Sequence, residues 1–172
     1  MENAAQYTQM NLSFTPPPAS TTYNVAGLNQ DAVIQMALNI LSQRNAIGEP
    51  MVKPSDAADY LRLKLSGYKN EVFCVIFLDR RHRILAFEEL FSGTIDGASV
   101  YPRVVVQRVM TNNASAVVFA HNHPSGIAEP SKADKFITKK LIDAMSLIDV
   151  RVLDHIVVGD SGTTSFAEQG LL

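Results

Sequence analysis

Two histidines and an aspartate in the second half of the chain could bind one metal ion. His121 and His123 follow an apolar run, residues 114–120, which predicts a short buried strand. Side chains two positions apart on an extended backbone point to the same side, so both imidazoles should face one place. An irregular loop then leads to Ser131, which should open a helix with Asp134 in its first turn. Two imidazoles and one carboxylate leave a fourth tetrahedral position for water, as in catalytic zinc sites.

Each part of this pattern also has a structural explanation. The histidines could be ordinary loop residues, and Ser131 with Asp134 three positions later resembles a helix capping box with aspartate in place of glutamate. Capping accounts well for these two residues. It does not account for two of the chain's four histidines standing at positions i and i+2 of a strand end. The complete set therefore favours a metal site.

Longer strings around these residues resemble a known superfamily. The pattern His-x-His-Pro, then Ser131 and Asp134, is similar to the JAMM motif of the MPN-domain metalloproteases. The strings HNHPSG (121–126) and LDHIVVG (153–159) resemble the bacterial RadC-type branch of that superfamily. The resemblance covers roughly residues 54–172 and implies an α/β or α+β, cytidine-deaminase-like MPN core with a mixed sheet flanked by helices. It also implies a zinc-dependent hydrolase of peptide or isopeptide bonds, with one Zn²⁺ per chain, and an association with DNA repair.

A hydrolase of this type also needs a group that accepts a proton and passes it on. Three glutamates precede the motif, and Glu88 and Glu89 should face opposite sides of a strand, so that one of them points inward. Glu71 instead stands at the start of a buried strand, which is the place of the catalytic glutamate in the JAMM family. We therefore expect Glu71 to be the general base; the alternative is a solvated carboxylate at a strand start. The resemblance further implies that Ser131 stabilises the oxyanion in addition to capping its helix.

Other polar positions leave more than one interpretation open. His155 could orient a ligand imidazole through its free nitrogen, or it could be a core histidine. Asn122 should point away from the two imidazoles and could order the loop. The basic turn at residues 80–83 could hold a phosphate or an acidic partner, although a solvated turn is the more common outcome.

Apolar periodicity and breaker residues predict the elements that must position these side chains. The expected helices span about residues 29–44, 55–66, 102–111 and 131–148. Asn29 and Ser55 are the expected caps of the first two. The expected strands are residues 71–79, 84–91, 114–120 and 151–158, the first two joined as a hairpin. This irregular alternation indicates an α/β or α+β sheet covered by helices.

The composition is that of one folded domain with an N-terminal arm. The chain has 172 residues, of which 47% are hydrophobic and 19% charged. We expect a flexible arm in residues 1–27, an amphipathic helix with a linker in residues 28–53, and the RadC-like domain in residues 54–172. The single Cys74 lies in an apolar run, so a buried thiol in a cytoplasmic protein is expected. The sequence contains no pattern of a signal peptide or a membrane span.

The net charge of the chain and its resemblance to RadC-type proteins give different indications about nucleic acid as a partner. A net charge of −2 offers no overall attraction for nucleic acid, although the RadC-like resemblance keeps DNA as a partner to consider. The expected partner is a protein or peptide substrate, and the amphipathic first helix could also cover a second copy of the chain, giving a homo-oligomer.

Two rival functions remain at this point. A metal-dependent phosphodiesterase or nuclease would call for basic residues around the ion, and Lys132 is the only one between residues 118 and 134 besides the histidines. The other rival is a non-catalytic MPN-type protein-interaction module. Longer RadC-type proteins carry a helix-hairpin-helix region suited to DNA, and residues 1–53 contain no glycine-bearing hairpin of that kind.

Overall fold

The computed structural model describes residues 27, 29–44, 54–65, 67–94, 99–160 and 162–172. Its helices are α1 (Gln30–Arg44), α2 (Pro54–Leu65), α3 (Pro102–Thr111) and α4 (Lys132–Ser146). Its strands are β1 (Val72–Leu78), β2 (Ile84–Ser92), β3 (Ala116–Asn122), β4 (Arg151–Val158) and β5 (Thr163–Ser165). None of the helices in these described ranges is long and apolar enough to cross a membrane. The predicted flexible arm, apart from Gly27, and the linker at residues 45–53 lie outside the described residues.

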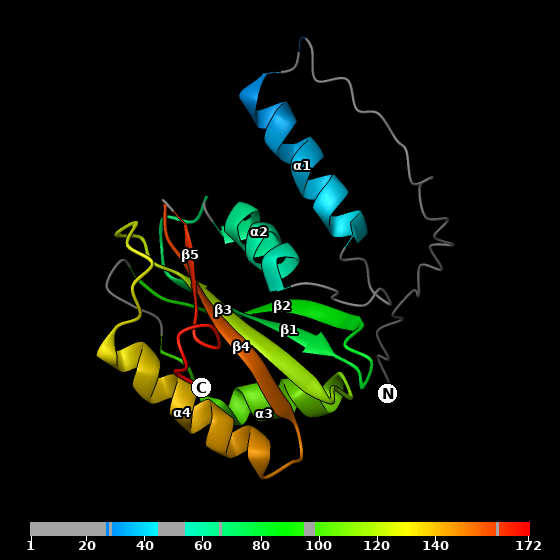
Figure 1. Ribbon diagram of the computed structural model, residues 1–172, viewed down its shortest axis with the longest axis vertical. Coiled ribbons are helices and arrows are strands. Elements are labelled where there is room, and N and C mark those ends of the chain that lie inside the picture. Colours follow the sequence, from blue (N-terminus) through cyan, green and yellow to red (C-terminus); the bar gives the residue numbers. More distant parts are fainter. Residues whose placement is uncertain (1–26, 28, 45–53, 66, 95–98, 161) are drawn as a thin grey trace, which may run out of the picture.

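The strands form one mixed sheet in the order β2-β1-β3-β4-β5 (Figure 1). β1 pairs antiparallel with β2 in the predicted hairpin and antiparallel with β3 on its other side. β3 and β4 are parallel, with α4 as the crossover between them, and β5 adds an antiparallel edge. All seven residues of β1 and of β3 are buried, which explains their continuous apolar sequences. The mixed sheet flanked by helices confirms the expected fold class.

Helices cover both faces of the sheet, with α3 and α4 on one side and α2 on the other (Figure 1). Side chains of β1 alternate between the two layers: Phe73 and Phe77 pack in the same cluster as Val105 of α3 and Leu141 of α4, while their neighbours pack against α2. The same alternation along β3 puts His121 on the α3/α4 face, at the end of the strand that leads into α4. The sheet and one helix terminus thus meet at the candidate site.

The predicted elements are present, with differences at their ends. α1 is capped as predicted, because the side-chain oxygen of Asn29 accepts a hydrogen bond of 2.8 Å from the backbone N–H three residues later. α2 begins at Pro54, so the predicted cap Ser55 lies inside the helix, since proline fits the first helical position. β3 runs to Asn122, two residues beyond its predicted end, because its last residues pair with both β1 and β4.

The C-terminal segment contains structure that the local sequence pattern does not predict. Residues Thr163–Ser165 form β5 against β4. Phe166 is fully buried, and its ring stacks on that of His155. The C-terminal segment therefore closes the sheet next to the candidate site.

α4 ends at Ser146, two residues earlier than predicted, and Asp149 takes a positive φ of 56° in the turn to β4.

Candidate metal centre

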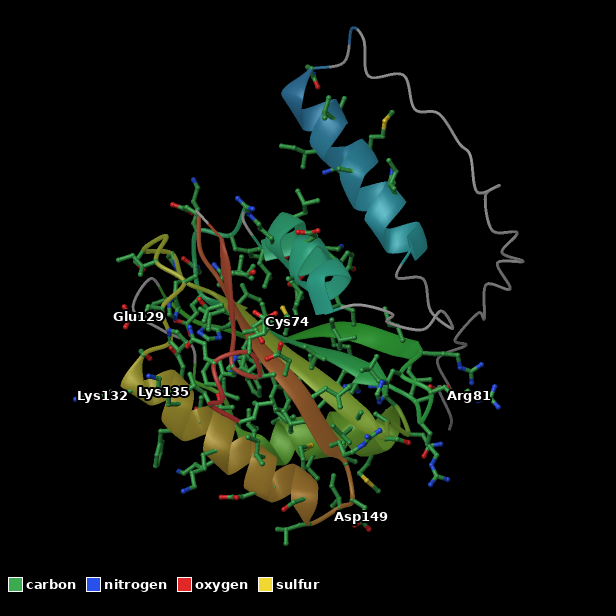
Figure 2. All side chains as sticks on the ribbon, viewed as in Figure 1. Cys74, Arg81, Glu129, Lys132, Lys135 and Asp149 are labelled. Atoms are coloured by element: carbon green, nitrogen blue, oxygen red, sulfur yellow. The ribbon has the colours of Figure 1, made fainter. Side chains whose placement is uncertain are left out.

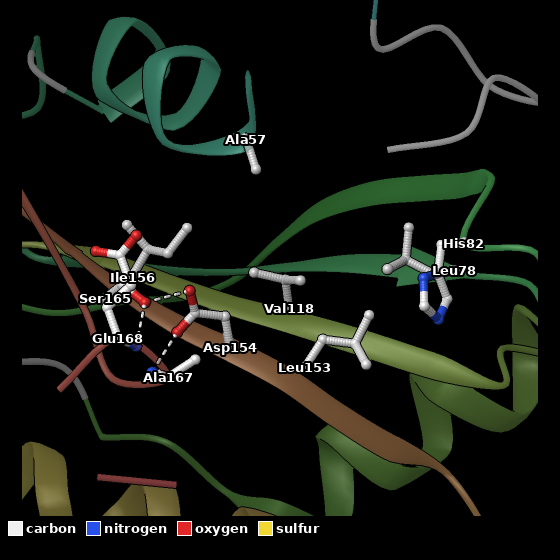
Figure 3. A pocket seen from close by; sticks show the side chains of 10 residues that line it. All are labelled: Ala57, Leu78, His82, Val118, Leu153, Asp154, Ile156, Ser165, Ala167 and Glu168. Carbon is white, nitrogen blue, oxygen red and sulfur yellow. Dashed lines mark hydrogen bonds between the residues drawn. The ribbon is translucent and has the colours of Figure 1, made fainter. Parts of the chain in front are cut away.

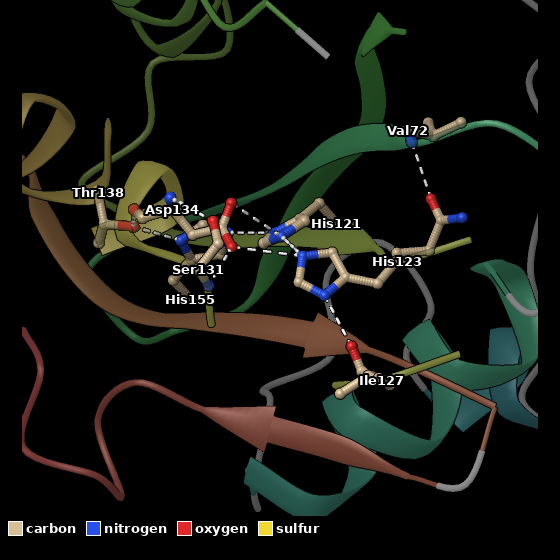
Figure 4. A network of polar contacts seen from close by, with 9 residues as sticks. Val72, His121, His123, Ile127, Ser131, Asp134, Thr138 and His155 are labelled. Atoms are coloured by element: carbon tan, nitrogen blue, oxygen red, sulfur yellow. Dashed lines mark hydrogen bonds and ion pairs between the residues drawn. The ribbon is translucent and has the colours of Figure 1, made fainter. Parts of the chain in front are cut away.

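His121, His123 and Asp134 converge at the end of β3, and we call these three residues the ligand cluster (Figure 4). The Nε2 atoms of the two histidines are 3.0 Å apart. His121 Nε2 lies 3.4 Å from Asp134 Oδ1, and His123 Nε2 lies 3.3 Å from Asp134 Oδ2. Ligand atoms about 2.0–2.1 Å from a tetrahedral zinc ion would be about 3.3–3.4 Å from one another. Each imidazole thus has one oxygen of the Asp134 carboxylate near it, and with one ligand atom taken from each residue the three atoms lie within 4.8 Å of one another, close enough to meet at one ion.

His155 and Thr138 hold the ring of His121 from its buried side (Figure 4). The Thr138 hydroxyl lies 2.6 Å from the Asp134 carbonyl oxygen, to which it donates, and 2.6 Å from His155 Nδ1. Because the single hydroxyl proton is used, His155 Nδ1 must donate to Thr138. Burial lowers the pKa of His155 well below its ordinary value, so its ring is neutral and its Nε2 accepts. His121 Nδ1, 2.8 Å away, therefore donates, which leaves the lone pair of His121 Nε2 for an ion.

His123 is held by a backbone group instead. Its Nδ1 lies 2.7 Å from the carbonyl oxygen of Ile127, which can only accept, so the proton of the neutral ring is on Nδ1 and Nε2 again faces the site. The hydrogen bond to Asp134 raises the pKa of His123, and the Ile127 carbonyl and the charges of Asp134 and Glu71 act in the same direction, against the effect of partial burial. A proton thus competes for the same nitrogen that would bind a metal.

Asp134 belongs to the ligand cluster and to the cap of α4 at once. Its Oδ2 accepts from the Ser131 N–H at 2.7 Å, and Ser131 Oγ accepts from the Asp134 N–H at 3.1 Å, which completes the capping box predicted from the sequence. Burial alone would raise the pKa of Asp134, but His121 and His123, which donate to its carboxylate when their rings are protonated, outweigh burial and hold that pKa far below its ordinary range. Because Ser131 Oγ is the acceptor in the cap, its hydroxyl proton stays available to another acceptor.

Glu71 lies beside the ligand cluster, at the place indicated by the sequence. The antiparallel register pairs Phe73 of β1 with His121 of β3, and Glu71 directly precedes β1 at this end of the sheet. The charge of Glu71 contributes to the raised pKa of His123. Backbone hydrogen bonds to the segment after β2 fix its main chain. The main chain of Glu71 is therefore fixed, and its carboxylate is near enough to His123 for the two charges to interact.

Asn122 holds the chain on both sides of Glu71. Its Oδ1 accepts from the Val72 N–H at 2.8 Å, and its Nδ2 donates to the Asn70 carbonyl at 3.0 Å. Asn122 is 4% exposed, so these two bonds are made in a buried environment where their loss would be costly. The sequence suggested that Asn122 orders the following loop; the structure shows that it orders the start of β1 instead.

The other acidic candidates have partners elsewhere. Glu88 pairs with Arg108 of α3 at 2.6 Å, and Glu89 accepts a hydrogen bond of 2.7 Å from the Tyr68 hydroxyl. The basic turn at residues 80–83 joins β1 to β2, at the end of β1 opposite to Glu71. These groups therefore do not take part in the ligand cluster.

A separate cavity of about 280 Å³ lies on the opposite face of the sheet, between α2 and β4 (Figure 3). Asp154 contributes a carboxylate to it, and its oxygens accept hydrogen bonds from the Ser165 hydroxyl at 2.6 Å and from the Ala167 N–H at 3.0 Å. These bonds tie β5 and the following turn to β4. Asp154 therefore has a structural role.

Thr138 is the residue of the site that sequence reasoning missed. It lies four residues after Asp134 on the same face of α4, and it is fully buried beside Leu141. A hydroxyl within an otherwise apolar helical stripe was the available signal. Of the two interpretations of His155, its contact with His121 favours the orienting one.

Comparisons with known proteins agree with this geometry. Residues 51–171 match the family model of the RadC-like JAB domain. The chain belongs to this family. A UPF0758 protein of Thioalkalivibrio sulfidiphilus is 56% identical over 141 residues, which are 82% of this chain and 63% of that protein. A UPF0758 protein of Vibrio cholerae is 55% identical over 140 residues, which are 81% of this chain and 88% of that protein.

The RadC-like resemblance of the strings HNHPSG and LDHIVVG is thereby confirmed. Membership in the RadC-like JAB domain family allows a metal-dependent hydrolase, and the ligand cluster is compatible with a JAMM-type metal site. The chain spans less than two thirds of the Thioalkalivibrio sulfidiphilus relative.

Proposed function

We propose that this RadC-like JAB domain is a zinc-dependent hydrolase that cleaves a peptide or isopeptide bond. The observation that carries the proposal is the convergence of donor atoms from His121, His123 and Asp134 within 4.8 Å of one another, with the second nitrogen of each imidazole already engaged. Zinc suits two imidazoles and one carboxylate with an open fourth position. Zinc held there would lower the pKa of a bound water to about 7 and polarise the scissile carbonyl.

Glu71 and Ser131 are the proposed catalytic residues. The Glu71 carboxylate, whose charge acts on His123, accepts a proton from the attacking water and later gives it to the leaving amine. The Ser131 hydroxyl accepts in the helix cap, so its own proton can stabilise the oxygen of the attacked carbonyl. Asn122 contributes indirectly, because it keeps the main chain around Glu71 in place.

Matched glutamate variants test this proposal. Wild type, Glu71→Gln and the control Glu89→Gln are purified without added metal, and zinc content and hydrolysis of quenched-fluorescent peptide and isopeptide libraries are measured. We expect about one zinc per chain in all three proteins and at least about 100-fold slower turnover in Glu71→Gln alone. A wild type without metal, or full turnover in Glu71→Gln, would refute the proposed mechanism. Zinc in all three proteins with no hydrolysis would support a non-catalytic interaction module instead.

A further inference from the structure

An open cleft leads away from the ligand cluster along the start of α4. Its volume is about 500 Å³, and His123 and Ser131 connect it to the cluster. The loop after β3 lines it with Ile127, whose side chain is 63% exposed, although the Ile127 carbonyl is fixed by His123. A substrate whose scissile bond lies at the cluster would therefore extend into this cleft.

Two lysines line the α4 side of the cleft (Figure 2). Lys132 and Lys135 are both within the first four residues of α4, where the helix dipole disfavours positive charge. Both are exposed, and no carboxylate in the described part of the chain lies within ion-pair distance of either. Because no ion pair within the described residues uses these two ammonium groups, their charge is available to a ligand in the cleft.

We propose that Lys132 and Lys135 bind a carboxylate of the peptide substrate, so that the site prefers an acidic side chain or a free C-terminus near the scissile bond. This inference rests on the proposed hydrolase function and specifies the substrate class of the same site. Lysine ammonium groups are flexible point charges and bind a carboxylate without requiring a planar match. Ile127 supplies apolar surface for the adjacent substrate residue.

The charges of the cleft favour a carboxylate over a nucleic-acid backbone. Glu129 lies in the same cleft and repels any anion, so it and the two lysines leave a net charge of about +1, which suits one carboxylate better than a run of phosphates (Figure 2). Nucleic-acid binding draws on several cations along a strand, and the chain as a whole carries a net charge of −2. A single carboxylate, in contrast, can be bound by the two lysines alone.

The test uses the full chain carrying Glu71→Gln, so that a bound peptide is not cleaved. Short randomised peptides, with free C-termini in one set and amidated ones in another, are captured on the protein, and their Asp and Glu content is compared with the input. Each exposed lysine–carboxylate contact should favour binding by about threefold, so acidic peptides should be enriched by up to about tenfold. The enrichment should vanish in Lys132→Gln/Lys135→Gln. It should persist in Lys139→Gln/Lys140→Gln, which removes the same charge from the same helix outside the cleft.

The outcomes separate this inference from the proposed function. Capture without acidic enrichment, no capture, or enrichment that survives the Lys132→Gln/Lys135→Gln change overturns it. Stronger competition by a single-stranded oligonucleotide than by an acidic peptide assigns the lysines to nucleic acid instead. Enrichment confined to the free C-termini identifies the terminal carboxylate, and enrichment in both sets identifies acidic side chains. Wild-type cleavage without acidic preference rejects only this inference, whereas acidic binding without cleavage rejects only the hydrolase function.

Discussion

Two polar networks join a strand to a helix in this fold, and only one of them is complete by itself. In the first, which we call the strand–helix clamp, Glu88 of β2 accepts hydrogen bonds from Arg108 and from Asn112 at the end of α3. Both contacts from Arg108 are 2.6 Å, in a bidentate arrangement, and the hydrogen bond to Arg108 lowers the pKa of Glu88. The negative charge of the clamp therefore meets a positive charge.

The ligand cluster is built in the opposite way. Its atoms that face the protein have partners, namely His155, the carbonyl of Ile127 and the N–H of Ser131. Its atoms that face inward bear lone pairs: the two imidazole Nε2 atoms lie 3.0 Å apart, and His121 Nε2 lies 3.4 Å from Asp134 Oδ1. Lone pairs at such distances repel unless a proton or a metal ion lies between them.

The difference shows how a binding site can be told from a structural network by its hydrogen bonds alone. In the clamp, donors and acceptors satisfy one another, so the network needs nothing from outside. In the ligand cluster, hydrogen bonds to the Nδ1 atoms fix the two imidazole rings, and the Nε2 atoms remain as acceptors for a cation. Mutations in the two networks should therefore have different consequences.

The largest difference is expected when one member of each network is removed. His121→Ala should lower the zinc content from about one per chain to near zero, because two remaining ligands hold zinc weakly. Arg108→Ala should leave the zinc content unchanged, since the clamp shares no hydrogen bond with the cluster in the described structure. Elemental analysis of the purified variants measures both. If the His121→Ala protein kept its zinc, the ligand cluster would not be the zinc site, and the proposed difference between the two networks would be wrong.

A smaller effect on the metal is expected from Thr138, which contacts the main-chain carbonyl of Asp134 and reaches the imidazole of His121 only through His155. Thr138→Val keeps the shape of the side chain but removes the acceptor for His155 Nδ1, so that the tautomer of His121 is no longer imposed. We expect zinc affinity about 10- to 100-fold weaker. Chelator competition measures it, and Thr138→Ser should restore it because the hydroxyl returns. Lower thermal stability with unchanged affinity would show that Thr138 is only structural.

Local sequence patterns were sufficient for the parts of the site that lie close together in the chain. The period-two spacing of His121 and His123 and the three-residue spacing of Ser131 and Asp134 follow from strand and helix geometry. Glu71 was located because it precedes a continuous apolar strand, with support from the family resemblance. These features need no knowledge of which strands are neighbours.

Contacts between distant segments were not accessible in this way. The placement of Asn122 against Asn70 and Val72 depends on the register of β1 and β3, which are separated by a helix and a hairpin. The approach of His155 to His121 depends on β4 lying parallel to β3, and neither pairing is encoded in a short window of sequence. The sequence could therefore propose the ligands, and His155 as one of two open interpretations, but not Thr138 or the contact of Asn122 with the start of β1.

The smallest effect is expected for Glu88→Gln, which keeps the shape of the clamp and removes its charge. The folded-state pKa of Glu88 is lowered, so its contribution to stability is present above the unfolded-state pKa of about 4.3 and is lost as the pH falls through the folded-state value. At pH 7 the melting temperature should fall by about 1–3 °C, the scale of a partly exposed ion pair. The difference from wild type should shrink below about pH 4, while zinc content at pH 7 stays unchanged. Thermal melts at several pH values measure this, and a loss of zinc in Glu88→Gln would mean that the two networks are not independent.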